Sequence, residues 1–392
     1  MSGHQSSTRG GCSRRAFLGA GIGLAGAGSI GRGGARARPA ASPLSARTSR
    51  PAAPVARAIE LAALERRMLA LPPRDRVAQL FVFEAEGTEM TPAYERRLLA
   101  TKPGGVLFVG PNIGTPDQLA GFVAAIQATN PAMPPLVTVD QEGGPVTRVP
   151  GDPVPGAAVL GRETDQAVEA GNRVRSVLLD DYGFDVNFAP VADVAYDDSS
   201  SMADRAFGSD PETVARKVAA VVEGGKGTNV IGAAKHFPGH GRAILDSHYA
   251  LPRLDVSYAE WLETDALPFK AAIAAGVPAI MLGHLQFSDW EGWGEDAASF
   301  SPVAVRVLRQ DLGFGGVIVT DDLGMDALAS WDPFDVVDRA IESGVDVLLY
   351  AQPPAPDADL IGHVVARVEA GEISEDRITA SLLRLAAMRA GR

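Results

Sequence analysis

The chain has 392 residues, 46% hydrophobic and 21% charged, a balance that is typical of a soluble globular protein and excludes a largely disordered one. The first 58 residues carry nine arginines and no Lys, Asp or Glu, whereas the remainder holds all 48 acidic residues against 27 basic ones, within a net charge of −12. So acidic a body repels phosphate groups, and we expect it to bind neither nucleic acid nor an anionic membrane surface.

The N-terminal segment is predicted to be a targeting signal rather than part of the folded domain. Arg14 and Arg15 precede a Gly- and Ala-rich apolar run over residues 17–30, and small residues near Ala35 offer a cleavage site. Residues 1–38 therefore look like a twin-arginine signal, which would place the mature protein in a periplasm or outside the cell. A disordered basic tail is the alternative, but it leaves the apolar run unexplained.

After removal of the signal, the chain is predicted to have no cysteine and to begin with a flexible linker. Cys12 is the only cysteine and precedes the apolar run, so cleavage would leave a chain with no disulfide, zinc-thiolate site or cysteine nucleophile. Residues 39–58 are rich in Ala, Pro, Ser and Arg and are predicted to form a flexible linker. The folded domain is expected to occupy residues 59–392.

Beyond the linker, short apolar runs alternate with longer helical patterns, which predicts βα units and a parallel sheet. Eight runs are expected to be strands: Val77–Phe83, Gly105–Val109, Leu136–Val139, Val186–Val191, Val230–Lys235, Ala279–His284, Val317–Thr320 and Val345–Leu349. Helices are expected at Pro116–Ala128, Asp165–Asp181, Pro211–Gly224, Tyr258–Ala275, Val303–Asp311, Asp357–Ala370 and Ser374–Met388.

Eight such units favour an α/β fold of the single (β/α)8 TIM-barrel type, with an open doubly wound sheet as the main alternative. Most strands are followed by polar clusters at their carboxyl ends: Asp140–Gln141–Glu142, Asp193, Lys235–His236, His284 and Asp321–Asp322. In a closed barrel these ends meet at one mouth, where the active sites of this fold are built, whereas an open sheet would spread them along a line.

The polar residues predicted at the mouth suggest chemistry on a hydroxyl-rich substrate, with no metal and no organic cofactor. The sequence contains no HExxH motif, P-loop or strand-following GxGxxG motif. His236, His240 and His248 lie in one glycine-containing stretch, so zinc has to be considered, but their spacing is not a recognised ligand set.

One stretch resembles the signature loop of glycoside hydrolase family 3. Residues 235–241 read Lys-His-Phe-Pro-Gly-His-Gly and residues 246–248 read Asp-Ser-His, similar to the β-N-acetylglucosaminidase branch of that family. Further segments agree in order and spacing: Gly104–Phe108, Asp140–Gly144, Asn187–Val191, Asp204–Phe207 and Val319–Met325. The resemblance covers most of the chain beyond the linker.

The resemblance implies a retaining double displacement through a covalent glycosyl-enzyme. Asp321 matches the nucleophile, His248 the acid/base, and Asp246 the carboxylate that orients the histidine ring. From the residues alone, either Asp321 or Asp322 could instead cap the following helix, and His248 could be a solvent-exposed loop histidine.

The resemblance also implies a set of sugar-binding residues. Those that match are Asp140, Arg148, Arg205, Lys235 and His236. Each has a structural alternative, because Asp-Arg and Lys-Asp pairs also occur at barrel mouths without touching a ligand.

Two features depart from the pattern of the family. Pro145 stands where the family usually has an arginine, so the group that this arginine would hold needs another partner here. Only two helices are expected after the eighth strand, so we expect no C-terminal sandwich of the kind that supplies the acid/base glutamate of many β-glucosidases. The second departure favours the branch with a histidine on a loop.

The implied activity is therefore a β-N-acetylhexosaminidase acting on terminal β-linked N-acetylglucosamine in peptidoglycan fragments or chitooligosaccharides. A β-glucosidase, β-xylosidase or phosphorylase of the same family is the alternative, and a non-catalytic cell-wall sugar-binding protein is a more remote one. The expected partner is a carbohydrate; we expect no nucleic acid, no membrane after signal removal, and a monomer.

Overall fold

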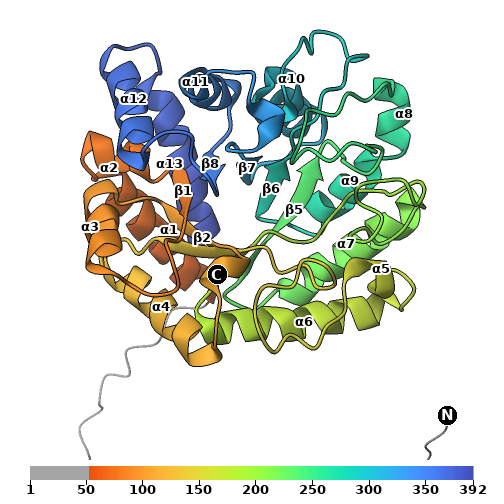
Figure 1. The fold of residues 1–392 in the computed structure, drawn as a ribbon, viewed down its shortest axis with the longest axis horizontal. Helices are drawn as coiled ribbons and strands as arrows, with labels where there is room; N and C mark the ends of the chain where they lie inside the picture. Colours follow the sequence, from red (N-terminus) through yellow and green to blue (C-terminus); the bar gives the residue numbers. More distant parts are fainter. Residues whose placement is uncertain (1–52, 392) are drawn as a thin grey trace, which may run out of the picture. The chain divides into compact units, whose positions relative to one another are not determined.

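The computed structural model describes residues 53–391, and these form a closed barrel of eight parallel strands in chain order, surrounded by helices (Figure 1). Pairing of the last strand with the first closes the barrel, which confirms the single (β/α)8 fold over an open doubly wound sheet. The strands are β1 Phe81–Glu84, β2 Gly105–Phe108, β3 Leu136–Val139, β4 Val186–Asn187, β5 Ile231–Phe237, β6 Ala279–Leu282, β7 Val317–Asp322 and β8 Val347–Tyr350.

The helices follow the strands in turn and cover the outside of the barrel (Figure 1). They are α1 Ala53–Leu69, α2 Pro73–Ala78, α3 Pro92–Thr101, α4 Pro116–Ala128, α5 Ala157–Leu160, α6 Asp165–Tyr182, α7 Pro211–Gly225, α8 Tyr258–Glu263, α9 Ala266–Ala274, α10 Pro302–Arg306, α11 Pro333–Ser343, α12 Asp357–Glu369 and α13 Glu375–Arg389. None of them is long and apolar enough to cross a membrane.

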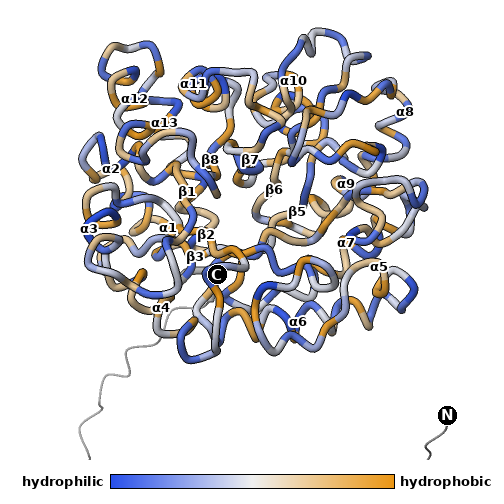
Figure 2. The backbone as a smooth tube through the Cα atoms, viewed as in Figure 1, coloured by the Kyte–Doolittle hydropathy of each residue, from blue (hydrophilic) through white to orange (hydrophobic). Residues whose placement is uncertain are grey.

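The strands are apolar because helices bury their outer face while the barrel interior buries the other. Every residue of β2, β3, β6 and β8 is buried, and β2 and β6 are drawn mainly in hydrophobic colours in Figure 2. The strands therefore form a rigid wall, and their polar carboxyl ends project from it at fixed positions.

Many of the helices start at a residue whose side chain accepts a hydrogen bond from the first turn, followed directly by proline. The missing N–H of proline costs nothing at this position, and its fixed φ suits the helix. This pattern starts α3, α4, α7, α10 and α11, with the caps Thr91, Thr115, Asp210, Ser301 and Asp332.

Several predicted boundaries differ from the structure. Helix α1 begins at Ala53, so the linker predicted to extend to residue 58 ends too late; the predicted twin-arginine signal lies outside the described residues. Val77 and Ala78 end helix α2 rather than begin the first strand. Strand β4 ends at Asn187, well before the predicted Val191.

Two predicted helices are interrupted. The run Tyr258–Ala275 is two helices, because Asp265 lies between them and its buried carboxylate pairs with Arg242 on another loop (2.8 Å). The run Val303–Asp311 begins one residue earlier as α10 and ends as a π-helical segment, Val307–Asp311.

Candidate active site

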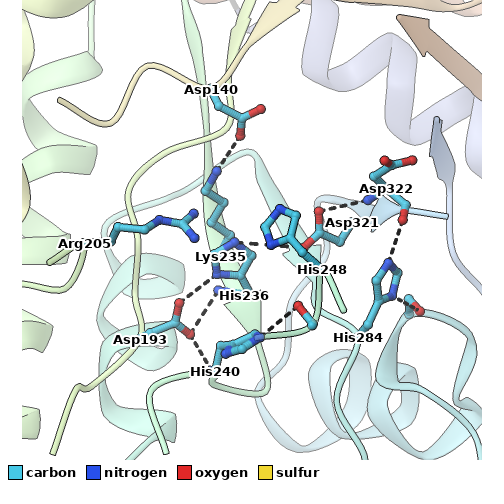
Figure 3. A network of polar contacts seen from close by, with 12 residues as sticks. Asp140, Asp193, Arg205, Lys235, His236, His240, His248, His284, Asp321 and Asp322 are labelled. Carbon is cyan, nitrogen blue, oxygen red and sulfur yellow. Dashed lines mark hydrogen bonds and ion pairs between the residues drawn. The ribbon is translucent and has the colours of Figure 1, made fainter. Parts of the chain in front are cut away.

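The strand-end clusters predicted from the sequence meet at the mouth of the barrel, as Figure 3 shows for residues of β5, β7 and their neighbours. Lys235 and His236 belong to β5, whose pairing with β6 is irregular between Ala234 and Phe237. Consecutive side chains of a regular strand point to opposite faces, and the irregularity relieves this constraint. Both side chains consequently reach polar partners at the mouth.

Lys235 lies among acidic side chains from the end of β3. Its Nζ is 2.7 Å from Glu142 Oε1 and also forms an ion pair with Asp140. Glu142 in addition accepts two hydrogen bonds from Arg205, at 2.9 and 2.7 Å. Pro145 supplies no cation, and the cations that pair with these strand-end carboxylates are Lys235 and Arg205.

The charges of this group sustain one another. Burial would raise the pKa of Glu142, but Lys235 and Arg205 lower it to about 2. Burial would likewise lower the pKa of Lys235, and the carboxylates of Asp140 and Glu142 outweigh it and raise that pKa. Asp140 keeps part of its surface exposed, so it has oxygen atoms available for sugar hydroxyls.

His236 links a buried carboxylate to Asp321. Its Nδ1 donates to Asp193 Oδ2 at 2.7 Å, and its Nε2 lies 4.0 Å from Asp321 Oδ2. Asp193 is completely buried, and burial would raise its pKa, but the adjacent His236 lowers it. Asp193 therefore remains an acceptor that fixes both the orientation and the tautomer of the His236 ring.

The structure distinguishes the two adjacent aspartates of β7. Asp322 Oδ1 accepts hydrogen bonds from the backbone N–H groups of Gly324 and Ala351, both at 2.9 Å, so its carboxylate ties the end of β7 to the end of β8. Asp321 Oδ1 accepts one backbone N–H at 2.9 Å, and its Oδ2 faces His236. Asp322 thus holds the backbone, whereas Asp321 presents a carboxylate oxygen to the mouth.

The environment of Asp321 keeps it ionised. Burial would raise its pKa, but the neighbouring His236, His284 and Lys235 lower it well below the ordinary value of 3.8. His284, itself buried, donates from Nε2 to the Asp322 carbonyl (2.8 Å) and accepts from Ser299 at Nδ1 (2.8 Å). This contact fixes the carbonyl of the residue that follows Asp321, so a negatively charged oxygen stands on a rigid strand end, as a nucleophile requires.

Asp246 and His248 form a pair on the loop after β5. His248 Nδ1 lies 2.7 Å from Asp246 Oδ1, which also accepts the backbone N–H of His248 at 2.9 Å. The His248 side chain is 60% exposed, and Figure 3 draws it beside the network of the mouth. Partial burial would raise the pKa of Asp246, but its hydrogen bonds from His248 lower it, so this carboxylate remains charged. With Nδ1 occupied, Nε2 is left to exchange a proton.

Arg148 is the predicted site residue that the structure holds least firmly. Its side chain is exposed on the loop after β3 and lies beside Gly110, while its backbone N–H donates to Gln141 (2.7 Å). Of the other predicted binding residues, Arg205 and Lys235 are joined through Glu142 and Lys235 also pairs with Asp140, whereas His236 pairs with Asp193.

Sequence reasoning placed Glu142, Asp193 and His284 among the strand-end clusters but gave them no role in the site. The structure shows them as the partners that hold Lys235, His236 and the Asp321–Asp322 backbone. A polar residue directly after a buried strand was the signal that could have identified them. Over residues 53–391, no group of three or more His, Asp or Glu side chains could hold a metal ion.

Comparison with known proteins gives the same picture. Residues 73–388 match the model of the glycosyl hydrolase family 3 N-terminal domain. A β-hexosaminidase of Nitrosospira multiformis is 33% identical over 79% of this chain and 88% of its own length.

Solved structures are similar as well. A family 3 β-N-acetylglucosaminidase of Paenibacillus superposes with a TM-score of 0.78 at 31% identity over 82% of this chain, which spans only 63% of that protein. LpqI of Mycobacterium tuberculosis superposes with a TM-score of 0.74 at 30% identity, over 83% of this chain and 96% of LpqI. With a family match that covers almost the whole barrel and a mouth built from the residues of the resemblance, the chain belongs to glycoside hydrolase family 3.

Proposed function

We propose that the protein is a retaining β-N-acetylhexosaminidase that releases terminal β-linked N-acetylglucosamine. The observation that carries this proposal is the ionised Asp321 at a rigid strand end, together with an Asp246–His248 pair on the adjacent loop. The β-hexosaminidase and β-N-acetylglucosaminidase names of the relatives support the choice of sugar.

In the proposed reaction, Asp321 Oδ2 attacks the anomeric carbon while His248 Nε2 gives its proton to the departing oxygen. The glycosyl-enzyme that results is an ester of Asp321. His248 then removes a proton from water, which attacks the anomeric carbon and frees Asp321, so that the β configuration is retained. Asp246 holds the ring through Nδ1, and its negative charge compensates that of the ring when it carries both protons.

Binding of the sugar is assigned to the network around Lys235. The partly exposed Asp140 would accept hydrogen bonds from sugar hydroxyls, Lys235 and Arg205 would donate to them, and His236 would contact them through Nε2. Arg148, exposed at the rim, is available to an anionic or hydroxylated group beyond the first sugar.

The proposal is tested by trapping the covalent intermediate with a 5-fluoro N-acetylglucosaminyl donor, followed by mass spectrometry of the digested protein. A label on the peptide that contains Asp321 is expected, and none on the Asp321→Asn variant. Labelling of another carboxylate would refute the assignment of the nucleophile. Faster turnover of nitrophenyl glucoside or xyloside than of the N-acetylglucosaminide would refute the substrate.

Analysis of the products formed from the nitrophenyl N-acetylglucosaminide distinguishes hydrolysis from phosphorolysis. We expect free N-acetylglucosamine as product both with and without phosphate. Accumulation of the sugar 1-phosphate would identify a phosphorylase, because phosphate would then replace water as the acceptor.

The site of action is proposed from the sequence of residues 1–38. A twin-arginine signal would deliver the enzyme to the periplasm or the medium, where peptidoglycan fragments and chitooligosaccharides are available. We further propose that the mature enzyme is a monomer that binds neither nucleic acid nor membranes, in keeping with its acidic body.

A further inference from the structure

The loop that carries Asp246 and His248, residues 238–257 between β5 and α8, is clamped at both ends by two tryptophans. The indole N–H of Trp261 donates to the carbonyl of Pro238 (2.7 Å), and that of Trp290 donates to the carbonyl of Val256 (3.1 Å). The two indole rings pack edge to face, with centroids 4.7 Å apart, and both are buried. The two ends of the loop are therefore fixed to one rigid aromatic cluster.

The first part of the loop, residues 238–243, is also fixed to the barrel. A Cβ on Gly241 would lie 2.0 Å from the Val194 carbonyl oxygen, so the backbone packs directly against that segment. The Ala243 carbonyl accepts the backbone N–H of Ser201 at 2.9 Å. Arg242 pairs with the buried Asp265 at 2.8 Å and lies over the ring of Tyr196.

The tip of the loop, residues 244–250, contrasts with its ends. Ile244 is 74% exposed and Tyr249 is 75% exposed, and both flank the Asp246–His248 pair. Within the tip, Ser247 alone is buried, with 3% of its surface exposed. The tip thus has one anchored residue, and it lies directly between Asp246 and His248.

Ser247 is anchored by His240. The two are joined by a hydrogen bond of 2.9 Å between Ser247 Oγ and His240 Nε2. Within residues 53–391, this is the one hydrogen bond or ion pair that joins the tip to the rest of the protein; the others of the tip are internal to it. Breaking it would release the tip while leaving both ends of the loop in place.

The contacts of His240 define its protonation. The Ser201 hydroxyl donates to the Ala243 carbonyl (3.0 Å), so its oxygen accepts from His240 Nδ1–H (3.2 Å). Nε2 is then the acceptor of the Ser247 hydroxyl. Burial lowers the pKa of His240 to about 4, which keeps this neutral form at working pH. The backbone N–H of His240 donates to Asp193 (2.6 Å), the carboxylate that also holds His236.

We propose that His240 and Ser247 act as a latch, a pair of positioning residues that sets the place of His248 for proton transfer. This inference rests on the proposed function, because it assigns the latch to the acid/base step of that reaction. Neither residue transfers the proton. Their bond fixes the residue immediately before His248 and couples the tip to Asp193, and hence to the His236 ring beside Asp321.

A latch that positions the acid has a kinetic signature that general loss of structure lacks. A good leaving group such as dinitrophenolate departs without a proton, whereas a sugar or an alkyl alcohol needs one. Misplacing His248 therefore slows only the reactions of poor leaving groups in the first step, and it slows attack by water, but not by azide, in the second.

The experiment compares Ser247→Ala with the wild-type protein, with Ser247→Thr, which keeps the hydroxyl, and with Ser288→Ala. Ser288 is a matched control, because its hydroxyl donates to Asp255 (3.0 Å) near the other end of the loop and is exposed. Values of kcat/KM are measured for N-acetylglucosaminides with leaving groups from dinitrophenol to a second sugar, and kcat for the dinitrophenyl substrate is measured with and without azide.

For Ser247→Ala we expect kcat/KM to fall about 10- to 100-fold on the disaccharide and to stay within about twofold on the dinitrophenyl glycoside. Azide is expected to raise kcat for this variant and to form the glycosyl azide, while Ser247→Thr recovers most of the loss and Ser288→Ala shows none. Equal losses on all leaving groups, or no loss, would overturn the latch. A wild-type protein inactive on every N-acetylglucosaminide would instead overturn the proposed function, and the latch with it.

Discussion

At the scale of single residues, the site is defined by which carboxylates are bound to neighbouring groups and which have an oxygen available to a substrate. Glu142, Asp193 and Asp322 each hold neighbouring cations or backbone N–H groups, whereas one oxygen of Asp321 is directed to the mouth. Burial by itself disfavours each of these charges, and for Glu142, Asp193 and Asp321 the compensating partners outweigh it and lower the pKa. Chemical role therefore follows from the partners of each residue rather than from its type.

The two aspartates of β7 give the sharpest comparison. Asp321→Asn is expected to lower kcat by about 10⁴-fold or more, because an amide cannot form the glycosyl ester. Asp322→Asn keeps an oxygen that accepts the Gly324 and Ala351 N–H groups, so we expect a loss below about tenfold. Steady-state kinetics on a nitrophenyl N-acetylglucosaminide measures both. Comparable losses in the two variants would contradict the assignment.

Glu142 predicts how stability depends on pH. Its pKa is about 2 in the folded protein against an ordinary value of 4.5, so its ion pairs stabilise the fold fully above pH 4.5 and are lost as the pH falls through 2. Glu142→Gln should therefore be less stable than the wild type at about pH 7, with the gap closing below about pH 4. Urea unfolding at a series of pH values measures the difference. A gap that is independent of pH would contradict this account.

At the scale of elements, the barrel combines a rigid wall with one exposed loop tip. The strands β5 and β7 carry Lys235, His236 and Asp321, while Asp246 and His248 lie on a loop whose ends are clamped by Trp261 and Trp290. Such a division suits a reaction in which the nucleophile must stay fixed and the acid must admit the substrate and then cover the leaving group.

The clamp is tested with Trp261→Phe. The change leaves the buried Pro238 carbonyl without its donor and removes part of a fully buried side chain, so we expect the free energy of unfolding to fall by about 2–4 kcal/mol. Trp331→Phe is the control, since Trp331 is only half-buried and packs edge to face on Phe300. Denaturant unfolding compares the two, and a loss no greater than that of the control would argue against the clamp.

At the scale of the whole molecule, the described residues 53–391 close the barrel by themselves, since β8 pairs with β1. Helix α13 packs against α1, which joins the two ends of this part of the chain. We therefore expect the N-terminal targeting signal and the catalytic barrel to function independently of each other.

Replacement of Arg14 and Arg15 by lysines is expected to keep the protein in the cytoplasm, because the twin-arginine route depends on that pair. The purified variant should keep the kcat/KM of the wild type, since both arginines precede the barrel. Cell fractionation with immunoblotting gives the location, and a nitrophenyl assay gives the activity. Unchanged export of the variant would refute the twin-arginine assignment.

The sequence by itself determined the parts of this protein that depend on neighbouring residues. Apolar runs of strand length identified all eight strands, because a strand buried on both faces must be apolar along its length. The stretch from Lys235 to His248 and the Asp321 segment pointed to the family, which the match over residues 73–388 confirms.

The tertiary structure alone decided what depends on residues far apart in the chain. The sequence could not separate Asp321 from Asp322, because their roles depend on Ala351 and His236, which other strands bring within reach. It could not show that Asp265 interrupts a helix to hold Arg242, or that His240 anchors Ser247. The physical reason is that a helix or strand follows from local periodicity, whereas a hydrogen-bond partner is known only when the barrel has closed.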